Sequence, residues 1–230
     1  YQMQTGEFRF VPGVVMNDIL LADEINRTSP KTQASLLEAM EERQITVDGR
    51  TMPLPALFMV IATQNPVEQL GTYRLPEAQL DRFMMKVSMG YPEKEREEAD
   101  IVRKALNGEA VKQLAPVTAR EDIIEMKKEI QDITVHDDIM DYAVEIARNT
   151  RKSRYLTLGA SPRAAIALVR ATRSRAYLEG RSFTTPEDVA ALAQPVLLHR
   201  LILSAQARLE GKKEKDVLQE AMRAAKVPVL

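Results

Sequence analysis

Two short apolar runs, Ile19 to Ala22 and Leu57 to Ala62, stand out in the first part of the chain. Continuous apolar runs of this length are typical of strands that are buried on both faces, and such strands belong to parallel sheets covered by helices. Ser29 and Pro30 lie between the two runs and predict the start of a helix, because serine is a favoured N-cap and proline suits the first helical position. The pattern therefore indicates an α/β domain.

Four further elements are predicted in the same part of the chain. Asp48-Gly49 lies between alternating residues and predicts a tight β-hairpin, because both central positions of a type I′ turn need positive φ. Pro76 lies near the start of a short helix, and Met84 to Met89 predict a third strand. The residues from Thr5 to Val15 predict a strand that leads into a loop.

Beyond Gly90 the pattern changes to apolar residues that recur with helical spacing. Helices are predicted over Glu93 to Asn107, after the capping-box spacing at Thr118 to Glu121, over His136 to Arg148, from Ser161 to about Leu178, and from Thr185 onward. No strand is expected after about Val87. The chain is therefore expected to comprise an α/β domain over residues 1–92 and a helical domain over residues 93–230.

Polar residues follow both apolar runs, at the edge of the predicted sheet where ligands bind. Asp23 and Glu24 follow the first run and Asn65 follows the second, so parallel neighbouring strands would place the three side chains together. Asp23 would then hold Mg²⁺ through water, Glu24 would polarise the water that attacks a terminal phosphate, and Asn65 would orient that water or contact the γ-phosphate. An acidic loop and an Asn-Pro turn are the ordinary explanations of the same residues.

The composition of the chain disfavours or excludes several kinds of binding partner and several kinds of site. The chain is 45% hydrophobic and 28% charged, which is typical of a globular protein, and its net charge of -1 gives no overall reason to expect nucleic acid or an anionic membrane. It has no cysteine, which excludes disulfides and thiolate metal sites and fits a reducing compartment. The apolar runs are too short for a membrane span. His136 and His199 have no companions at ligand spacing, so no metal beyond Mg²⁺ is expected.

Six motifs support a more specific interpretation. They are LLADEINR at residues 20–27, EAMEER at 38–43, ATQNP at 62–66, LPEAQLDRF at 75–83, GASPR at 159–163 and TTPEDV at 184–189. The first four, in this order and spacing, resemble the MoxR family of AAA+ ATPases, and the last two resemble the lid domain of that family. The resemblance covers nearly the whole chain. It implies a P-loop NTPase-type AAA+ parallel-sheet domain, truncated at the N-terminus, followed by an all-α lid domain.

The resemblance also implies roles for single residues. Asp23 and Glu24 are similar to the Walker B pair, and Asn65 is similar to the sensor 1 residue. The cofactors implied are ATP and Mg²⁺, with Asp23 as the residue that holds the metal. The hairpin from Ile45 to Leu54 is similar to the pre-sensor 1 hairpin, and Thr5 to Val15 is similar to the end of the helix 2 insert.

Two arginines complete the implied site. Arg82 is similar to the arginine finger, which reaches the γ-phosphate bound by the neighbouring subunit. A surface ion pair with Asp81 is the ordinary explanation of this arginine. Arg163 is similar to the sensor 2 arginine, which contacts nucleotide from the lid of its own subunit. An arginine supplied by a neighbour makes hydrolysis depend on assembly.

The function implied is that of a MoxR-type ATPase that forms a ring, expected to be a hexamer, in the cytoplasm. It would remodel or activate a protein client, often together with a von Willebrand factor A domain protein. Two alternatives remain open: an AAA+ motor that moves nucleic acid, which the near-neutral charge disfavours, and a non-catalytic interaction subunit without a P-loop.

The family's P-loop, G-x-x-x-x-G-K-[ST], does not occur in this chain. The only Gly-Lys pair is Gly211-Lys212, in a charged tail that is expected to be helical. The family places this loop upstream of the stretch that begins at Tyr1. We therefore expect that an N-terminal segment with the loop is missing and that the chain as written binds ATP poorly. A degenerate, non-hydrolysing homologue is the alternative explanation.

Overall fold

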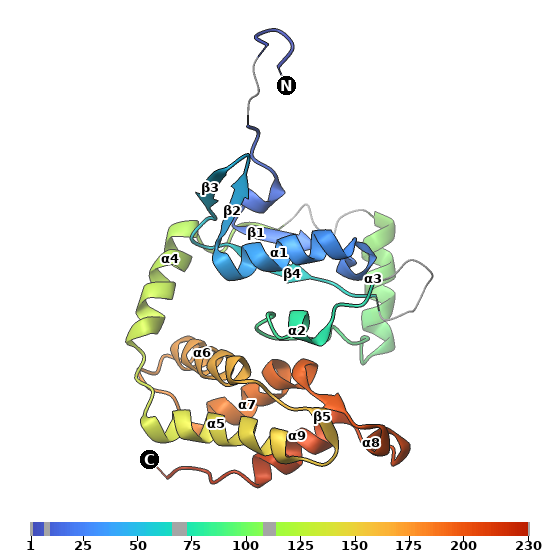
Figure 1. Cartoon of the computed structure of the whole chain (residues 1–230), viewed down its shortest axis with the longest axis vertical. Coiled ribbons are helices and arrows are strands. Elements are labelled where there is room, and N and C mark those ends of the chain that lie inside the picture. Colours follow the sequence, from blue (N-terminus) through green and yellow to red (C-terminus); the bar gives the residue numbers. More distant parts are fainter. Residues whose placement is uncertain (1, 7–9, 66–72, 108–113, 230) are drawn as a thin grey trace. The chain divides into compact units, whose positions relative to one another are not determined.

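The computed structural model of the chain describes residues 2–6, 10–65, 73–107 and 114–229. The chain divides into two compact units, Tyr1–Phe83 and Met84–Leu230 (Figure 1). The boundary expected after residue 92 therefore lies inside the second unit.

A two-stranded parallel sheet lies at the centre of the first unit (Figure 1). Strands β1 (Ile19–Ala22) and β4 (Met59–Ala62) pair in a register that places Ala22 beside Ala62. The connection between them contains η2 (Ile25–Arg27), α1 (Pro30–Glu42), β2 (Gln44–Val47) and β3 (Arg50–Pro53). The parallel pairing predicted from the two apolar runs is confirmed.

Helix α1 packs against one face of this sheet. Its first turn forms as predicted, because the side chain of Ser29 accepts a hydrogen bond from the N–H of Thr32 at 3.2 Å. Leu20 and Val60 of the sheet belong to the same apolar cluster as Ala39 of α1. The packing of these residues fixes the face of the sheet that is covered.

The opposite face of the sheet is exposed in the described chain. The exposed fractions are 59% for Ile19, 63% for Leu21, 50% for Met59 and 48% for Ile61. Side chains alternate between the two faces of a strand, and among the described residues of the first unit only one face has a helix packed against it. The prediction that these strands are buried on both faces is therefore wrong for this chain.

The predicted hairpin is confirmed. Asp48 has φ 49° and Gly49 has φ 75°, so both central residues of the turn between β2 and β3 have the positive φ that a type I′ turn requires. The hydroxyls of Thr46 and Thr51 lie 3.0 Å apart across the strands. The short helix α2 (Glu77–Leu80) starts after Pro76, also as predicted.

One predicted strand does not form, and another falls partly outside the described residues. Residues 84–89 contain no strand; instead the N–H of Lys86 donates to the carbonyl of Pro195 in α7 (Pro186–Leu197) at 2.8 Å. A strand needs a partner strand, whereas this backbone bonds to a helix. In the stretch from Thr5 to Val15, residues 7–9 lie outside the described residues, and the others contain turns and the 3-10 helix η1 (Val14–Met16) but no strand.

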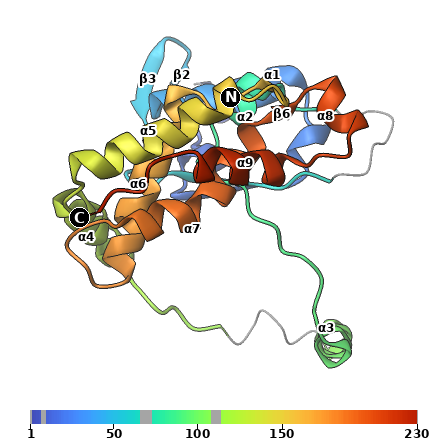
Figure 2. The ribbon, with the colours of Figure 1, turned by 90° about the horizontal axis from the view of Figure 1, so that it is seen from below.

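The second unit is mainly helical. Its helices are α3 (Glu95–Asn107), α4 (Arg120–Glu129), η3 (Ile130–Asp132), α5 (Asp137–Lys152), α6 (Pro162–Leu178), α7, η4 (Leu198–Arg200), α8 (Ala205–Leu209) and α9 (Glu214–Arg223). Figure 2 shows α5, α6, α7 and α9 side by side, and residues from all four form one apolar core. No helix within the described ranges is long and apolar enough to cross a membrane.

A short antiparallel ladder corrects the expectation that no strand follows Val87. Strands β5 (Leu156–Leu158) and β6 (Ile202–Leu203) pair across a long sequence separation. Strands this short have no periodicity that could distinguish them from loops. Gly211, which was expected in a helical tail, has φ 71° and lies in the turn between α8 and α9.

The cap of α4 also differs from the predicted one. The carboxylate of Asp122, rather than that of Glu121, accepts hydrogen bonds from the N–H of Ala119 at 2.9 Å and from the hydroxyl of Thr118 at 3.1 Å. These two bonds stabilise the charged form and hold the pKa of Asp122 below its usual value. The helix therefore starts one residue later than the Thr118 spacing predicted.

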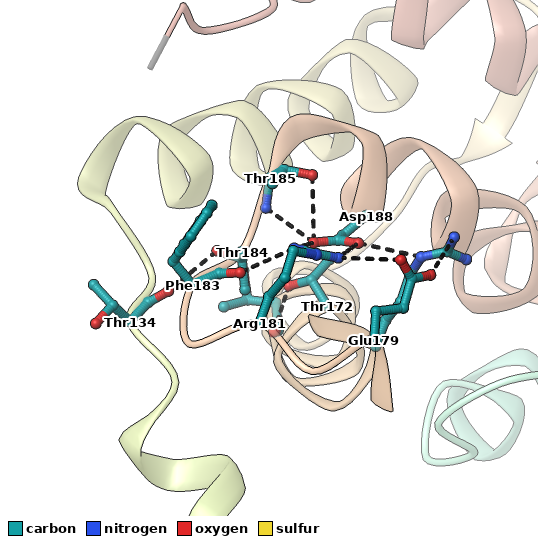
Figure 3. A network of polar contacts seen from close by, with 10 residues as sticks. Thr134, Thr172, Glu179, Arg181, Phe183, Thr184, Thr185 and Asp188 are labelled. Atoms are coloured by element: carbon teal, nitrogen blue, oxygen red, sulfur yellow. Dashed lines mark hydrogen bonds and ion pairs between the residues drawn. The ribbon is translucent and has the colours of Figure 1, made fainter. Parts of the chain in front are cut away.

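A buried carboxylate organises the start of α7 (Figure 3). Asp188, whose side chain is 2% exposed, accepts hydrogen bonds from Arg181 at 2.7 and 2.9 Å and from Arg175 at 3.2 Å. It also accepts one from the N–H of Thr185 at 2.9 Å. Burial alone would raise the pKa of Asp188, but the bonds from Arg181 and Thr185 and the two positive charges hold it below its usual value. This carboxylate therefore has a structural role within the helical unit.

Candidate functional site

Three of the predicted site residues lie at one edge of the parallel sheet. Asp23 and Glu24 follow β1 directly, and Asn65 follows β4. The side-chain N–H of Asn65 donates to Oε1 of Glu24 at 3.2 Å. The register of β1 and β4 therefore places residues that are far apart in sequence in direct contact.

Thr63 joins the two acidic residues and was missed by the sequence analysis. Its hydroxyl donates to Oδ1 of Asp23 and accepts a hydrogen bond from the backbone N–H of Glu24 at 2.8 Å. Its carbonyl accepts from the N–H of Ile25 at 3.0 Å, so backbone bonding continues beyond the ends of the strands. Its position directly after β4 was the signal in the sequence, since it shares the sheet edge with Asp23.

Glu24 has an unusual backbone and two side-chain partners. Its φ of 47° and ψ of 51° lie in the left-handed region, which costs about 1 to 3 kcal/mol for a residue other than glycine and often marks functional sites. In addition to the bond from Asn65, Oε2 of Glu24 forms an ion pair with Nε of Arg27 at 3.0 Å. Both carboxylate oxygens are therefore oriented by donors from the same sheet edge.

Two buried amide side chains support the loops behind this edge. Asn26 is 7% exposed and donates to the carbonyl of Asn65 at 3.2 Å. Gln33 of α1 is 2% exposed and donates to the carbonyls of Ile25 at 3.1 Å and Tyr73 at 3.0 Å. Gln33 lies four residues before the buried Leu37, so a polar residue on the apolar face of a helix was the signal that the sequence analysis missed.

The donor set at this edge fits a magnesium ion bound with nucleotide. The side chain of Asp23 is exposed and supplies a carboxylate, a hard oxygen ligand of the kind that Mg²⁺ prefers. The described residues contain no group of three or more histidine, cysteine, aspartate or glutamate side chains that could hold a metal. Mg²⁺ usually keeps several waters and binds through one or two carboxylates together with phosphate oxygens, and Asp23 suits this mode.

Arg82 pairs with a different residue from the one expected. Its Nη2 lies 3.1 Å from Oε2 of Glu41 on α1, so the ion pair considered with Asp81 is not the one that forms. Glu38, Glu41, Glu42, Gln79 and Arg82 are among the residues that line a pocket of about 320 Å³. Among the described contacts, none joins the side chain of Arg82 to Asp23, Glu24 or Asn65.

Arg163 occupies the first turn of α6, in the second unit. The helix is capped by Ser161, whose hydroxyl accepts a hydrogen bond from the N–H of Ala164 at 3.2 Å, so the predicted start of this helix is confirmed. The side chain of Arg163 is exposed. The other candidate residues belong to the first unit.

Comparison with known proteins identifies both parts of the chain. Residues 1–85 match the ATPase family associated with various cellular activities (AAA), and residues 148–221 match the AAA lid domain. The chain is 48% identical over 229 residues to the YeaC protein of Bacillus subtilis (strain 168); the match covers 100% of this chain and 71% of YeaC. It is 37% identical over 237 residues to Chaperone MoxR1 of Mycobacterium tuberculosis, with 99% of this chain and 62% of MoxR1 covered.

The chain belongs to the MoxR family of AAA+ ATPases. A crystal structure of a Cytophaga hutchinsonii protein has a TM-score of 0.90 and 36% identity to this MoxR-family chain, and the match covers 100% of this chain and 72% of that one. The predicted fold class, an AAA+ parallel-sheet domain followed by a helical lid, is thereby confirmed. The chain spans less than two thirds of the length of MoxR1.

Proposed function

We propose that the intact protein hydrolyses ATP at the sheet edge formed by Asp23, Glu24 and Asn65. The observation that supports this most directly is the 3.2 Å contact between Asn65 and Glu24, beside the exposed carboxylate of Asp23. In phosphoryl transfer, catalysis depends mainly on positioning and on neutralising charge. The carboxylate of Glu24 and the amide of Asn65, held together at the carboxyl ends of parallel strands, suit the first task, and Mg²⁺ held by Asp23 would supply the second.

Each residue has a separate task in this proposal. Asp23 holds Mg²⁺, directly or through water, and the ion neutralises phosphate charge when it is bound. Glu24 accepts a hydrogen bond from the attacking water and polarises it. Asn65 orients the carboxylate of Glu24 and contacts the water. Thr63 keeps Asp23 and the backbone of Glu24 in register.

The proposed active form is a ring, which we take to be a hexamer. Arg82 of one subunit would contact the γ-phosphate bound by its neighbour, and Arg163 of the lid would contact nucleotide in its own subunit. Both assignments rest on the family and on the motifs that contain these residues. The assembly proposal predicts that the intact protein has the mass of an oligomer when ATP and Mg²⁺ are present, as measured by light scattering.

The proposed client is a protein, and the proposed compartment is the cytoplasm. The relative MoxR1 is called a chaperone, which supports a remodelling or activating role for this chain. A von Willebrand factor A domain protein is proposed as the partner that presents the client. The net charge of -1 favours a protein client over nucleic acid.

The test is ATP hydrolysis by the intact protein and by two variants, Glu24→Gln and Arg82→Ala. Each variant is expected to lose at least about a hundredfold in kcat, because each removes a group that acts only in the transition state. Mixing the two variants should restore part of the activity, since junctions with an intact Glu24 and an intact Arg82 form again. Glu125→Gln and Arg103→Ala, which alter exposed ion pairs in the second unit, serve as matched controls.

The other outcomes separate the competing functions. If the intact protein neither binds nor hydrolyses ATP, a non-catalytic interaction subunit becomes the better explanation. If it binds DNA with an affinity that falls steeply with salt, a nucleic-acid motor is favoured. If both variants are inactive and mixing restores nothing, the active site is not shared between subunits.

A further inference from the structure

The side chain of Arg82 is held by its own subunit. The residue lies in the turn after α2, where its N–H donates to the carbonyl of Gln79 at 3.2 Å and the neighbouring Phe83 packs on an apolar cluster that includes Leu37 of α1. The backbone is therefore anchored next to α1. From this position Nη2 reaches Oε2 of Glu41, at 3.1 Å.

The contact leaves most of the guanidinium available. An arginine side chain has five N–H donors in a planar fork, and the pair with Glu41 uses one nitrogen. The side chain of Arg82 is 33% exposed, and it borders the pocket of about 320 Å³ on α1. A second anion, such as a phosphate oxygen, can therefore bind the same guanidinium while Glu41 keeps its place.

The ion pair with Glu41 would help catalysis by orienting the guanidinium of Arg82 before it meets a phosphate. A long arginine side chain loses rotamer freedom when it is ordered at a phosphate, and a partner that orders it beforehand removes part of that cost. An exposed ion pair contributes little to folding, so stability alone is a poor explanation of the contact. Small errors in the placement of a charged group are costly in phosphoryl transfer, because catalysis there depends on geometry.

We propose that Glu41 is a positioning residue for Arg82: it orients the guanidinium toward nucleotide bound by the neighbouring subunit. This inference rests on the proposed function, in which Arg82 acts across the junction between subunits. In this proposal Glu41 acts through Arg82 and not by contact with the nucleotide. Its loss should lower the rate of hydrolysis in the neighbour's site and leave ATP binding in its own site unchanged.

The test compares Glu41→Gln with Glu42→Gln in the intact protein. Glu42 is the adjacent carboxylate on α1 and lines the same pocket, so its substitution is a matched control for the loss of one charge. For Glu41→Gln we expect kcat to fall by about tenfold to a hundredfold, with KM for ATP within about twofold of the wild type. Glu41→Asp keeps the charge and should recover part of the rate, and the melting temperatures of all three variants should match the wild type.

Mixing experiments distinguish an effect of Glu41 on the neighbouring subunit's site from an effect confined to its own subunit. When Glu41→Gln subunits are mixed with Glu24→Gln subunits, some junctions contain an intact Glu24 together with an oriented Arg82, so activity should rise above that of either variant alone. A structural role of Glu41 confined to its own subunit would give no such recovery. The inference is overturned if Glu41→Gln has wild-type kcat, if Glu42→Gln is equally slow, or if mixing restores nothing.

The activity of Arg82→Ala shows whether the role of Arg82 fails or only the positioning role of Glu41. If Arg82→Ala hydrolyses ATP at the wild-type rate, the arginine-finger assignment fails and the role of Glu41 fails with it. If Arg82→Ala is inactive and Glu41→Gln is fully active, the proposed function stands and only the positioning role of Glu41 is wrong.

Discussion

The buried carboxylate of the helical unit and the exposed carboxylates at the sheet edge of the first unit use charge in opposite ways. In the helical unit, the side chain of Asp188 is 2% exposed and is surrounded by Arg175, Arg181 and the N–H of Thr185. In the first unit, the ion pair between Glu24 and Arg27 has side-chain exposures of 38% and 47%. Charge is enclosed where it maintains the fold and accessible where we propose that it meets ligand.

The apolar side chains of the two units also differ in how completely they are buried. In the helical unit Ile139, Ile146, Leu168 and Leu197 are each 0% exposed, so α5, α6 and α7 bury apolar side chains in a shared core. The sheet of the first unit has one covered face and one exposed face. The comparison indicates that the stability of the chain by itself depends mainly on the helical unit, whereas the chemistry that we propose takes place at the sheet edge.

The largest expected effect on stability comes from the core of the helical unit. Leu168→Ala removes a fully buried side chain from the apolar core and should lower the free energy of unfolding by about 3 kcal/mol, because it loses burial and leaves a cavity. Urea denaturation of the chain measures this. Ile166→Ala on the same helix is the control: Ile166 is 53% exposed, and its substitution should cost less than about 1 kcal/mol. Equal losses for the two variants would show that burial in the core of the helical unit does not determine the loss of stability.

An intermediate effect is expected from the buried carboxylate. Asp188→Asn keeps an oxygen that can cap α7 but removes the charge that pairs with Arg181 and Arg175, so the free energy of unfolding should fall by about 2 kcal/mol at pH 7. Denaturation at several pH values measures it. Glu179→Gln is the control, since Glu179 pairs with the same two arginines at 49% exposure and should cost less than about 0.5 kcal/mol.

The pH dependence of this difference has a definite sign. The pKa of Asp188 is lower in the folded chain than in the unfolded chain, so its contribution is fully present above the unfolded pKa of about 4. The contribution is lost as the pH falls through the folded value. The gap in stability between the wild type and Asp188→Asn should therefore be constant from pH 7 to about pH 5 and should narrow below about pH 4. A gap that widens in acid would contradict the assignment.

The smallest effect on stability is expected at the proposed catalytic glutamate. Glu24→Gln breaks an exposed ion pair with Arg27 and keeps an oxygen that can accept from Asn65, so the free energy of unfolding should change by less than about 0.5 kcal/mol. The same variant of the intact protein is expected to lose hydrolysis. A stability loss as large as that of Asp188→Asn would instead make Glu24 a structural residue.

Local sequence signals were reliable where one residue type decides the backbone. Asp48-Gly49 gave the hairpin because few residues tolerate the positive φ that its turn requires. Ser29 and Ser161 gave the starts of α1 and α6 because their hydroxyls bond the free N–H groups of the first turn. Residues 85–89 alternate between apolar and polar side chains, yet they form no strand, and the N–H of Lys86 bonds instead to a carbonyl of α7.

Residue types and their spacing predicted the parallel pair of β1 and β4, the hairpin, the two unlike parts of the chain and the polar residues that follow β1 and β4. The partners of the site residues became known from the folded chain: Asn65 and Arg27 for Glu24, Thr63 for Asp23, and Glu41 for Arg82. Caps and turns depend on neighbours within a few residues, and their energies can be read from local residue types. Contacts such as that between Glu24 and Asn65 depend on strand register and helix packing, which the whole fold sets through many weak interactions.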